Sequence, residues 1–318
     1  MSDPITEPTL ATSPRDGQLV TRILSVVGKI LVGAGVLLLL FTAFELWGTA
    51  VLEARSQAAL RSQIAPRLPD RGAVPKAVQT PAPTGPPQVA PTTAPPALGQ
   101  PIGTIIIPKI GVNKVILEGT RTQDLRQGPG HYPGTALPGQ AGNAAIAGHR
   151  TTYAKPFYNL QAMAPGDLVF IVTTQGAFAY SVISVAPVAP TDVSVLAPTA
   201  TPMLTLTTCN PRYSARQRLV LHAVLVRSVL VGSGLPAPPA AAPKGPSTTS
   251  SLAGSSTGVD WLLAIVWGII TFAVGLACVL VARRTRRPWL VYPVGGVTFL
   301  VVLFFFFIAV SPLVPASF

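Results

Sequence analysis

Three long runs of apolar residues interrupt an otherwise mixed chain, and each predicts a membrane-spanning helix. The runs cover residues 23–47, 259–282 and 289–311. A helix of about 20 apolar residues crosses the hydrocarbon core of a bilayer, and each run approaches that length. Buried helices of soluble proteins rarely combine this length with this apolarity, so we interpret the second and third runs as membrane spans.

The first run also fits a cleaved signal peptide. Basic residues Arg15, Arg22 and Lys29 lead into it, and residues 48–50 after it are small. The basic lead is long for a signal peptide, so we favour a retained span preceded by a cytoplasmic segment, residues 1–22.

The loop between the second and third runs sets the topology. Residues 283–288 hold four arginines, and short arginine-rich loops stay on the cytoplasmic side of a membrane. The second span therefore starts outside, and we expect the chain between the first two spans to be extracytoplasmic. Residues 312–318 are left as a C-terminal tail.

Two proline-rich segments bracket a stretch of ordinary globular composition. Residues 48–101 and 231–258 predict extracytoplasmic linkers, and residues 102–230 predict one folded domain. The net charge is +12, but the basic residues are scattered or flank the apolar runs. No basic stripe is interleaved with aromatic residues in the middle of the chain, which excludes nucleic acid as the expected partner.

The pattern within residues 102–230 is mostly that of short β-strands. Weak helical patterns at Thr122–Gln127 and Pro156–Met163 predict one or two turns each. Many short strands with glycine and proline turns indicate a small closed barrel. The predicted strands are Ile102–Ile107, Lys114–Leu117, Asn143–Gly148, Leu168–Thr174, Ala177–Val185, Met203–Thr208 and Arg218–Val226.

Cys209 is the first candidate for chemistry. The other cysteine, Cys278, lies in the second span, so Cys209 has no disulfide partner within the expected extracytoplasmic domain. It ends a β-branched run, and Pro211 stops the strand two residues later. A small buried core residue and a nucleophile facing a groove are equally good interpretations of this position alone.

A cysteine nucleophile needs a nearby base, and the chain has three histidines. His149 follows a predicted strand where the chain turns, His131 lies in a turn-rich loop, and His222 lies in the last strand. The pattern favours His149, and it leaves His131 and His222 open.

Acyl transfer also needs a donor for the charge that develops on the carbonyl oxygen. Arg218 comes nine residues after Cys209, on a strand expected to return beside it, and Arg216 is predicted to share its face. Arg212 lies in the intervening loop. A solvated charge at the barrel rim is the better interpretation of Arg212 and Arg216.

Several motifs in this order and spacing resemble the sortase family over roughly residues 102–226. They are Ile107-Pro108-Lys109-Ile110, Gly130-His131-Tyr132-Pro133-Gly134-Thr135, Gly142-Asn143, Ala147-Gly148-His149-Arg150, Pro165-Gly166-Asp167 and Thr205-Leu206-Thr207-Thr208-Cys209 followed by Arg218.

The resemblance implies a mainly β fold, an eight-stranded sortase-type β-barrel, joined here to three transmembrane helices. It implies a cysteine transpeptidase, a peptidase-type acyl transferase, with His149, Cys209 and Arg218 as catalytic residues. Cys209 would attack the Thr–Gly carbonyl of an LPxTG- or LAxTG-like C-terminal sorting signal. His149 would move the protons, and Arg218 would hold the substrate and the oxyanion. Thr207 and Thr208 are candidates for substrate binding.

The implied partners are surface proteins with C-terminal sorting signals, the amine of a lipid-linked cell-wall precursor, and the membrane. No cofactor, no metal and no nucleic acid is implied. The resemblance places the protein in the cell membrane of a Gram-positive-type cell, with its catalytic domain on the extracytoplasmic side.

The chain looks most like class E sortases of actinobacteria. Pilin-polymerising class C sortases are the alternative, since many carry a C-terminal span, but they usually have an Asp-Pro-aromatic lid, and here Asp70 is followed by Arg71. Two C-terminal spans depart from the simplest sortase plan. A secreted cysteine hydrolase with the same Cys–His pair and a non-catalytic membrane scaffold are alternatives from other classes.

Overall fold

The computed structural model describes residues 14–69, 87–230, 260–285 and 288–313. The chain divides into two compact units, Met1–Phe44 and Glu45–Phe318, and each is described by itself. The linker expected at residues 231–258, the position of Asp70 and most of the expected C-terminal tail lie outside the described residues.

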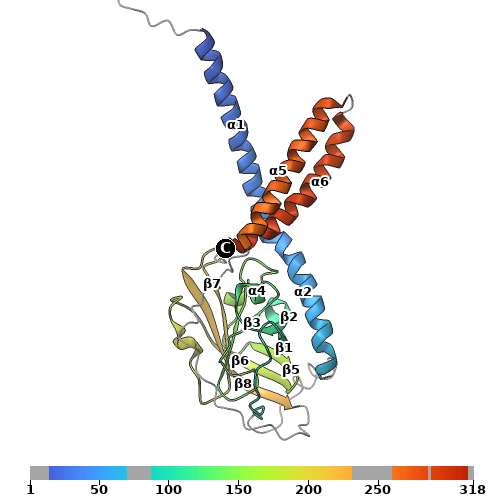
Figure 1. Cartoon of the computed structure of the whole chain (residues 1–318). Helices are drawn as coiled ribbons and strands as arrows, with labels where there is room; N and C mark the ends of the chain where they lie inside the picture. The colour runs from blue at the N-terminus through green and yellow to red at the C-terminus, as the bar shows by residue number, and fades with distance from the viewer. Residues whose placement is uncertain (1–13, 70–86, 231–259, 286–287, 314–318) are drawn as a thin grey trace, which may run out of the picture. The chain divides into compact units, whose positions relative to one another are not determined.

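The described part of the first unit is a single helix, α1 (Pro14–Ala43). A π-helical turn at Phe44–Gly48 leads into the second unit, which begins with α2 (Thr49–Ile64) and a 3₁₀ turn at Ala65–Arg67. The described part of the second unit then contains a β-barrel and a pair of C-terminal helices (Figure 1).

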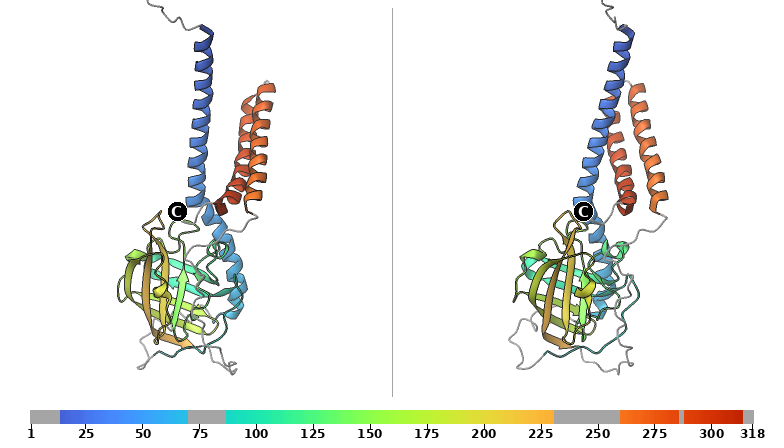
Figure 2. Two further views of the ribbon diagram at one scale, coloured as in Figure 1. Left: turned by 60° about the vertical axis from the view of Figure 1, so that its left-hand side comes forward. Right: turned by 90° about the vertical axis from the view of Figure 1, so that its left-hand side faces the viewer.

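The eight strands form a closed barrel in the order β1-β2-β3-β4-β7-β8-β6-β5. The implied eight-stranded barrel is thereby confirmed, and Figure 2 shows it from two further sides. Short helical turns at α4 (Thr122–Leu125), Pro108–Ile110, Leu160–Ala162 and Val193–Leu196 lie between strands. The strands are β1 (Pro101–Ile107), β2 (Val112–Glu118), β3 (Gly130–His131), β4 (Asn143–Ala147), β5 (Leu168–Thr173), β6 (Gly176–Val188), β7 (Met203–Asn210) and β8 (Gln217–Leu230).

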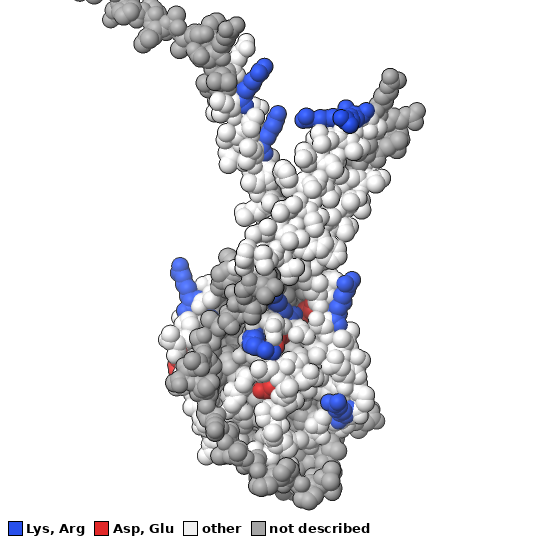
Figure 3. All heavy atoms as spheres, viewed as in Figure 1, with Lys and Arg blue, Asp and Glu red and all other residues white. Residues whose placement is uncertain are grey.

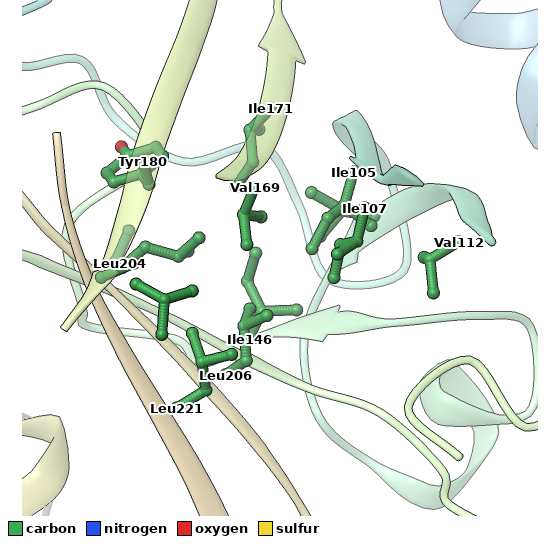
Figure 4. Packing of buried hydrophobic residues seen from close by; sticks show 14 of the residues in the cluster. Ile105, Ile107, Val112, Ile146, Val169, Ile171, Tyr180, Leu204, Leu206 and Leu221 are labelled. Atoms are coloured by element: carbon green, nitrogen blue, oxygen red, sulfur yellow. The ribbon is translucent and has the colours of Figure 1, made fainter. Parts of the chain in front are cut away.

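The barrel interior is filled by aliphatic side chains from all around the sheet. Ile105 and Ile107 are two residues apart on β1, so they point to the same face, and both are fully buried. Ile146 of β4 and Leu206 of β7 meet them in the same cluster (Figure 4). Burial of such side chains stabilises the fold by about 1.5–3 kcal/mol each.

Two strand pairs of the barrel are parallel, and one of them brings distant motifs together. β4 pairs with β7 in parallel, with Ala147 opposite Thr207. β7 then pairs with β8 antiparallel, with Cys209 opposite Arg218. Since parallel strands end at the same edge of a sheet, the residues that follow β4 lie beside the end of β7.

The segment expected to be a linker from residue 48 onward differs from that expectation at both ends. Helix α2 packs on the barrel through a buried face at four-residue spacing, and Gln57 on that face bonds with both backbone groups of Val115. At the far end, Ala90 forms a bridge with Gln140, and Gly99 donates to the Glu118 carbonyl. Residues 49–64 contain no proline and so can form a helix, and at the far end the backbone contacts to the barrel hold the proline-rich chain in place.

The C-terminal helices α5 (Asp260–Arg284) and α6 (Pro288–Val310) pack side by side and end in a 3₁₀ turn at Ser311–Leu313 (Figure 1). Three helical stretches are long and apolar enough to cross a membrane: Thr21–Arg67, Trp261–Arg284 and Pro293–Val310. Figure 3 shows basic side chains at the tip of the α5–α6 pair and none along its visible length. Three membrane helices are confirmed in this sense, and the predicted topology stays a prediction.

Candidate active site

Cys209 lies near the end of β7, where the strand leaves the buried core. Its side chain is partly exposed, whereas Thr207 and Thr208 before it are buried. Arg218 is its direct partner on β8. The placement predicted from the return of the strand is therefore confirmed in register, with thiol and guanidinium on neighbouring strands.

His149 reaches the same edge of the barrel from β4. The Gly148 amide donates to the Thr207 carbonyl at 3.1 Å, and the Thr208 hydroxyl donates to the Gly148 carbonyl at 2.7 Å. These two bonds continue the parallel pairing for one more residue, so His149 comes next to Cys209. The structure thus gathers His149, Cys209 and Arg218 at one edge.

The imidazole of His149 is buried, at 7% exposure, and its surroundings leave one nitrogen unused. Among the described residues, Nε2 of His149 has no hydrogen-bond partner. A buried ring nitrogen without a partner costs free energy unless it serves a bound molecule. A substrate or the neighbouring thiol can supply that partner.

The electrostatics of the pair favour neutral groups at rest. Burial, with a smaller effect of the nearby Arg126 cation, lowers the pKa of His149 to about 4. Burial also raises the pKa of the Cys209 thiol, while the positive charges of Arg218 and Arg150 oppose that rise. A neutral imidazole beside a thiol can accept the thiol proton when an electrophile arrives.

Arg150 is a site residue that the sequence interpretation did not single out. Its Nη1 donates to the Cys209 carbonyl at 2.9 Å and to Oδ1 of Asn210 at 2.6 Å, and its Nη2 donates to Gln161. Arg150 is 5% exposed. The Ala-Gly-His-Arg motif was the available signal, but only its histidine had an obvious chemical use.

The two threonines before the cysteine use their hydroxyls within the protein. Oγ1 of Thr207 lies 3.0 Å from the phenol of Tyr132, and that of Thr208 bonds to the Gly148 carbonyl. Both residues hold the end of β7 against its neighbours. Their predicted role in substrate binding is not tested by these contacts and stays a prediction.

The other two histidines occupy different surroundings. His131 is fully buried, with Nδ1 at 2.8 Å from Glu118 and Nε2 at 2.9 Å from the Ala136 carbonyl. His222 pairs with Thr205, four residues before Cys209 on β7, and its Nδ1 lies 3.0 Å from that hydroxyl. Neither ring is placed beside the thiol, so the geometry favours His149.

The two other arginines lie outside the thiol's strand pair. Arg212 stacks over the ring of Tyr158 at 4.0 Å, and its Nη2 donates to Asn159. Arg216 lies before β8 begins and is exposed, so the expectation that it shares a strand face with Arg218 is wrong. The loop after β7 runs to Arg216, and β8 begins at Gln217, one residue before the predicted start at Arg218.

Possible metal ligands are scattered in the part of the chain that the structure describes. No group of three or more His, Cys, Asp and Glu side chains there could hold a metal ion. Cys278 lies within α5, with its Sγ at 3.6 Å from the Gly295 carbonyl of α6. That the protein needs no cofactor stays a prediction.

Comparisons with known proteins agree with this geometry. A family model described as Sortase domain matches residues 105–226. Sortase SrtE1 of Streptomyces coelicolor is 33% identical over 226 residues, which cover 66% of this chain and 59% of the relative. The chain thus spans about three fifths of the length of that relative.

Further relatives are of the same E type. Sortase SrtE2 of Streptomyces coelicolor is 28% identical over 230 residues, covering 67% of this chain and 86% of the relative. A solved structure of sortase E from Streptomyces avermitilis is 37% identical and covers 44% of this chain and 97% of that chain, with a TM-score of 0.39. The predicted resemblance to class E sortases is confirmed by the relatives of this type.

Proposed function

Since the chain belongs to the sortase family, whose members are transpeptidases, we propose that it cleaves a C-terminal sorting signal and transfers the acyl group to an amine. The observation that supports the proposal is the parallel pairing of β4 with β7, which brings the backbone of His149 to the end of the strand that carries Cys209. A buried imidazole with an open Nε2, on the residue beside the cysteine, suits a base for covalent acyl transfer.

The first half of the reaction forms a thioester. Cys209 Sγ attacks the carbonyl carbon of the Thr–Gly bond in an LPxTG- or LAxTG-like signal, and His149 takes the thiol proton. As the tetrahedral intermediate collapses, the C–N bond breaks and His149 returns that proton to the leaving glycine amine. The peptide's acyl part remains on Cys209 as a thioester.

The second half transfers the acyl group to an amine of a lipid-linked cell-wall precursor. His149 takes a proton from the incoming amine as its nitrogen attacks the thioester carbon. Collapse expels the Cys209 sulfur, which recovers a proton from His149. A new amide bond replaces the thioester, and the enzyme returns to its starting state.

Arg218 is proposed to stabilise the oxygen that becomes negative in both tetrahedral intermediates. Its place opposite Cys209 on β8 supports this role, as does its influence on the Cys209 thiol. A guanidinium stays charged at any working pH and offers several donors in a fixed plane. Thr207 and Thr208 shape the same edge and are proposed to contact the peptide.

We further propose that the barrel lies on the extracytoplasmic face of the membrane of a Gram-positive-type cell. The support is the cluster of basic residues, Arg283 and Arg284, in the last turn of α5. New single cysteines in the Ala65–Pro101 segment should label from outside intact cells, and cysteines beside Arg284 should not. The opposite pattern would overturn this topology.

The test of the function uses the full chain in detergent micelles, a panel of sorting-signal peptides and an amine acceptor. Cys209→Ala should abolish both peptide cleavage and amide formation, because no other group forms the thioester. Cys278→Ala is the matched control and should keep both. Mass spectrometry with and without the amine separates the alternatives, since hydrolysis that is indifferent to the amine would identify a hydrolase.

A further inference from the structure

The turn that follows His149 carries a tyrosine against the imidazole. The ring of Tyr153 lies 5.1 Å from that of His149, centroid to centroid, at an interplanar angle of 32°. Both rings are buried. Among the described residues no hydrogen bond to Nε2 of His149 orients the imidazole, so packing against Tyr153 contributes to its orientation.

The backbone of this turn is strained. Tyr153, Ala154 and Lys155 have φ values of 49°, 57° and 52°, three successive left-handed residues without a glycine. Each such residue costs on the order of 1–3 kcal/mol, and it persists only where the surroundings hold it. The turn needs partners outside itself.

Two of those partners come from the segments that lead to the membrane helices. The Tyr153 amide donates to Oγ1 of Thr49, the first residue of α2, at 3.1 Å. The Tyr153 phenol lies 2.9 Å from Oγ of Ser311, which directly follows α6. Thr49 is fully buried and Ser311 is 8% exposed, so water competes little for either bond.

Two charged side chains, Arg126 and Glu45, complete this cluster, and the Glu45 carboxylate accepts from Ser311. The guanidinium carbon of Arg126 lies 5.8 Å from the centre of the Tyr153 ring. The same cation disfavours a proton on His149. A displacement of Tyr153 would therefore change both the packing and the electrostatic surroundings of the imidazole.

We propose that Tyr153 is a positioning residue for His149, and that the C-terminal helix pair fixes it through Ser311. The proposal rests on the function proposed above, in which His149 moves protons for Cys209. It assigns the α5–α6 pair a role beyond anchoring: the end of α6 supports the turn that carries the base. Detaching that end should leave the barrel folded and the imidazole badly placed.

The experiment compares variants of the full chain in detergent micelles. Tyr153→Phe removes only the phenol, Ser311→Ala removes its partner, and the double variant removes both. Loss of one hydrogen bond should lower kcat about 2- to 10-fold with KM nearly unchanged. The two losses should be less than additive in the double variant, because both single variants remove the same bond. Tyr153→Phe also removes a contact to Arg126, and Ser311→Ala removes one to Glu45. Thr298→Ala is the control, since that exposed α6 hydroxyl bonds only within its own helix.

A second readout does not depend on transfer. The rate at which iodoacetamide alkylates Cys209, followed by peptide mass spectrometry against pH, reports whether a base assists the thiol. We expect the profile to shift toward that of an unassisted thiol in Tyr153→Phe and Ser311→Ala, and to stay unchanged in Thr298→Ala.

The outcomes separate the two proposals. If Ser311→Ala matches Thr298→Ala in kcat and in alkylation profile, the helix pair does not position the base. Additive losses in the double variant would mean that the two hydroxyls act independently, which also overturns the proposal. If the unmodified chain forms no amide with any peptide, the proposed function fails, and the alkylation profiles alone decide the role of Tyr153.

Discussion

The surroundings of His131 and of His149 can be compared within one small part of the barrel. His131 pairs with Ile146 of β4, and His149 follows the end of that same strand. Both rings are buried. Around His131, each ring nitrogen faces an oxygen atom, supplied by Glu118 on one side and by Ala136 and Thr135 on the other. Around His149, one nitrogen has no such partner within the described residues.

The difference shows that burial alone does not distinguish a structural histidine from one available for catalysis. A buried histidine whose nitrogens are both occupied stabilises the fold and has nothing left to offer a substrate. A buried histidine with an open nitrogen beside a thiol holds an unsatisfied group where chemistry can use it. The four predictions below break or sharpen this comparison, beginning with the largest expected effect.

Removing the imidazole of His149, whose Nε2 has no partner among the described residues, should damage catalysis far more than stability. His149→Gln should lower turnover roughly 10²–10⁴-fold, because general acid–base transfer is lost in both halves of the reaction. Turnover of the full chain with a sorting peptide and an amine checks this. A variant that keeps more than about a tenth of its turnover would remove His149 from the mechanism.

Replacing Arg218, the residue opposite Cys209 on β8, should have the next largest effect on turnover. If Arg218 stabilises the oxyanion, Arg218→Lys should lower kcat about 10²–10³-fold with a smaller change in KM, since lysine lacks the planar fork of donors. Arg216→Lys is the control, because Arg216 is exposed and precedes β8. Equal kinetics for the two variants would take the catalytic role away from Arg218.

Removing the imidazole of His131, whose two nitrogens both have partners, should damage stability far more than catalysis. His131→Ala leaves the buried Glu118 carboxyl without its partner, and loss of one member of such a pair costs about 3–5 kcal/mol of unfolding free energy. Turnover per folded molecule should stay near normal. Pulse proteolysis in urea measures the loss, and His222→Ala, which removes a single hydroxyl contact from a half-buried ring, should cost less. A stable but inactive His131→Ala protein would contradict the comparison.

The smallest effect is on the pH dependence of stability. Folding lowers the pKa of His149 from 6.5 to about 4, so between these values the unfolded chain binds the extra proton. Stability should therefore fall as the pH falls through this window, by at most about 3 kcal/mol from this group.

His149→Gln isolates that contribution. Burial also lowers the pKa of His222, but that ring contributes equally to the pH dependence of stability in the unmodified chain and in His149→Gln. Urea midpoints from pulse proteolysis at about pH 7 and pH 4.5 should lie further apart in the unmodified chain than in the variant, because only the former carries the buried neutral imidazole. Equal separations would show that folding does not hold His149 neutral.

Much of the barrel could be predicted from the sequence because its strands carry strong local patterns. Each of the seven predicted strands lies at the place of an observed strand. The two-residue strand β3 (Gly130–His131) was missed, since two residues cannot show an alternation. The pairing of Cys209 with Arg218 was predictable because a short return between antiparallel strands fixes the neighbours.

The other features of the fold and the site could not be predicted, because they depend on contacts between distant segments that leave no local pattern in the sequence. Helix α2 was missed because its buried face begins with Thr49, Glu53 and Gln57, so no apolar stripe marks it. Tyr153 was missed because its left-handed turn contains no glycine and its partners come from the two ends of the chain. The choice among three histidines also required the parallel pairing of β4 with β7.

That parallel pairing has a consequence for the order of events during folding. Gly148 and Thr208, which join the edges of the site, are 60 residues apart in the chain. Non-local parallel contacts form late, because the chain must lose the entropy of closing the intervening loop before any bond rewards it. A newly made chain therefore carries its cysteine without the proposed base until the barrel closes. The thiol gains its base only when folding is complete, so an unfinished chain does not cleave its own peptide bonds or those of its neighbours.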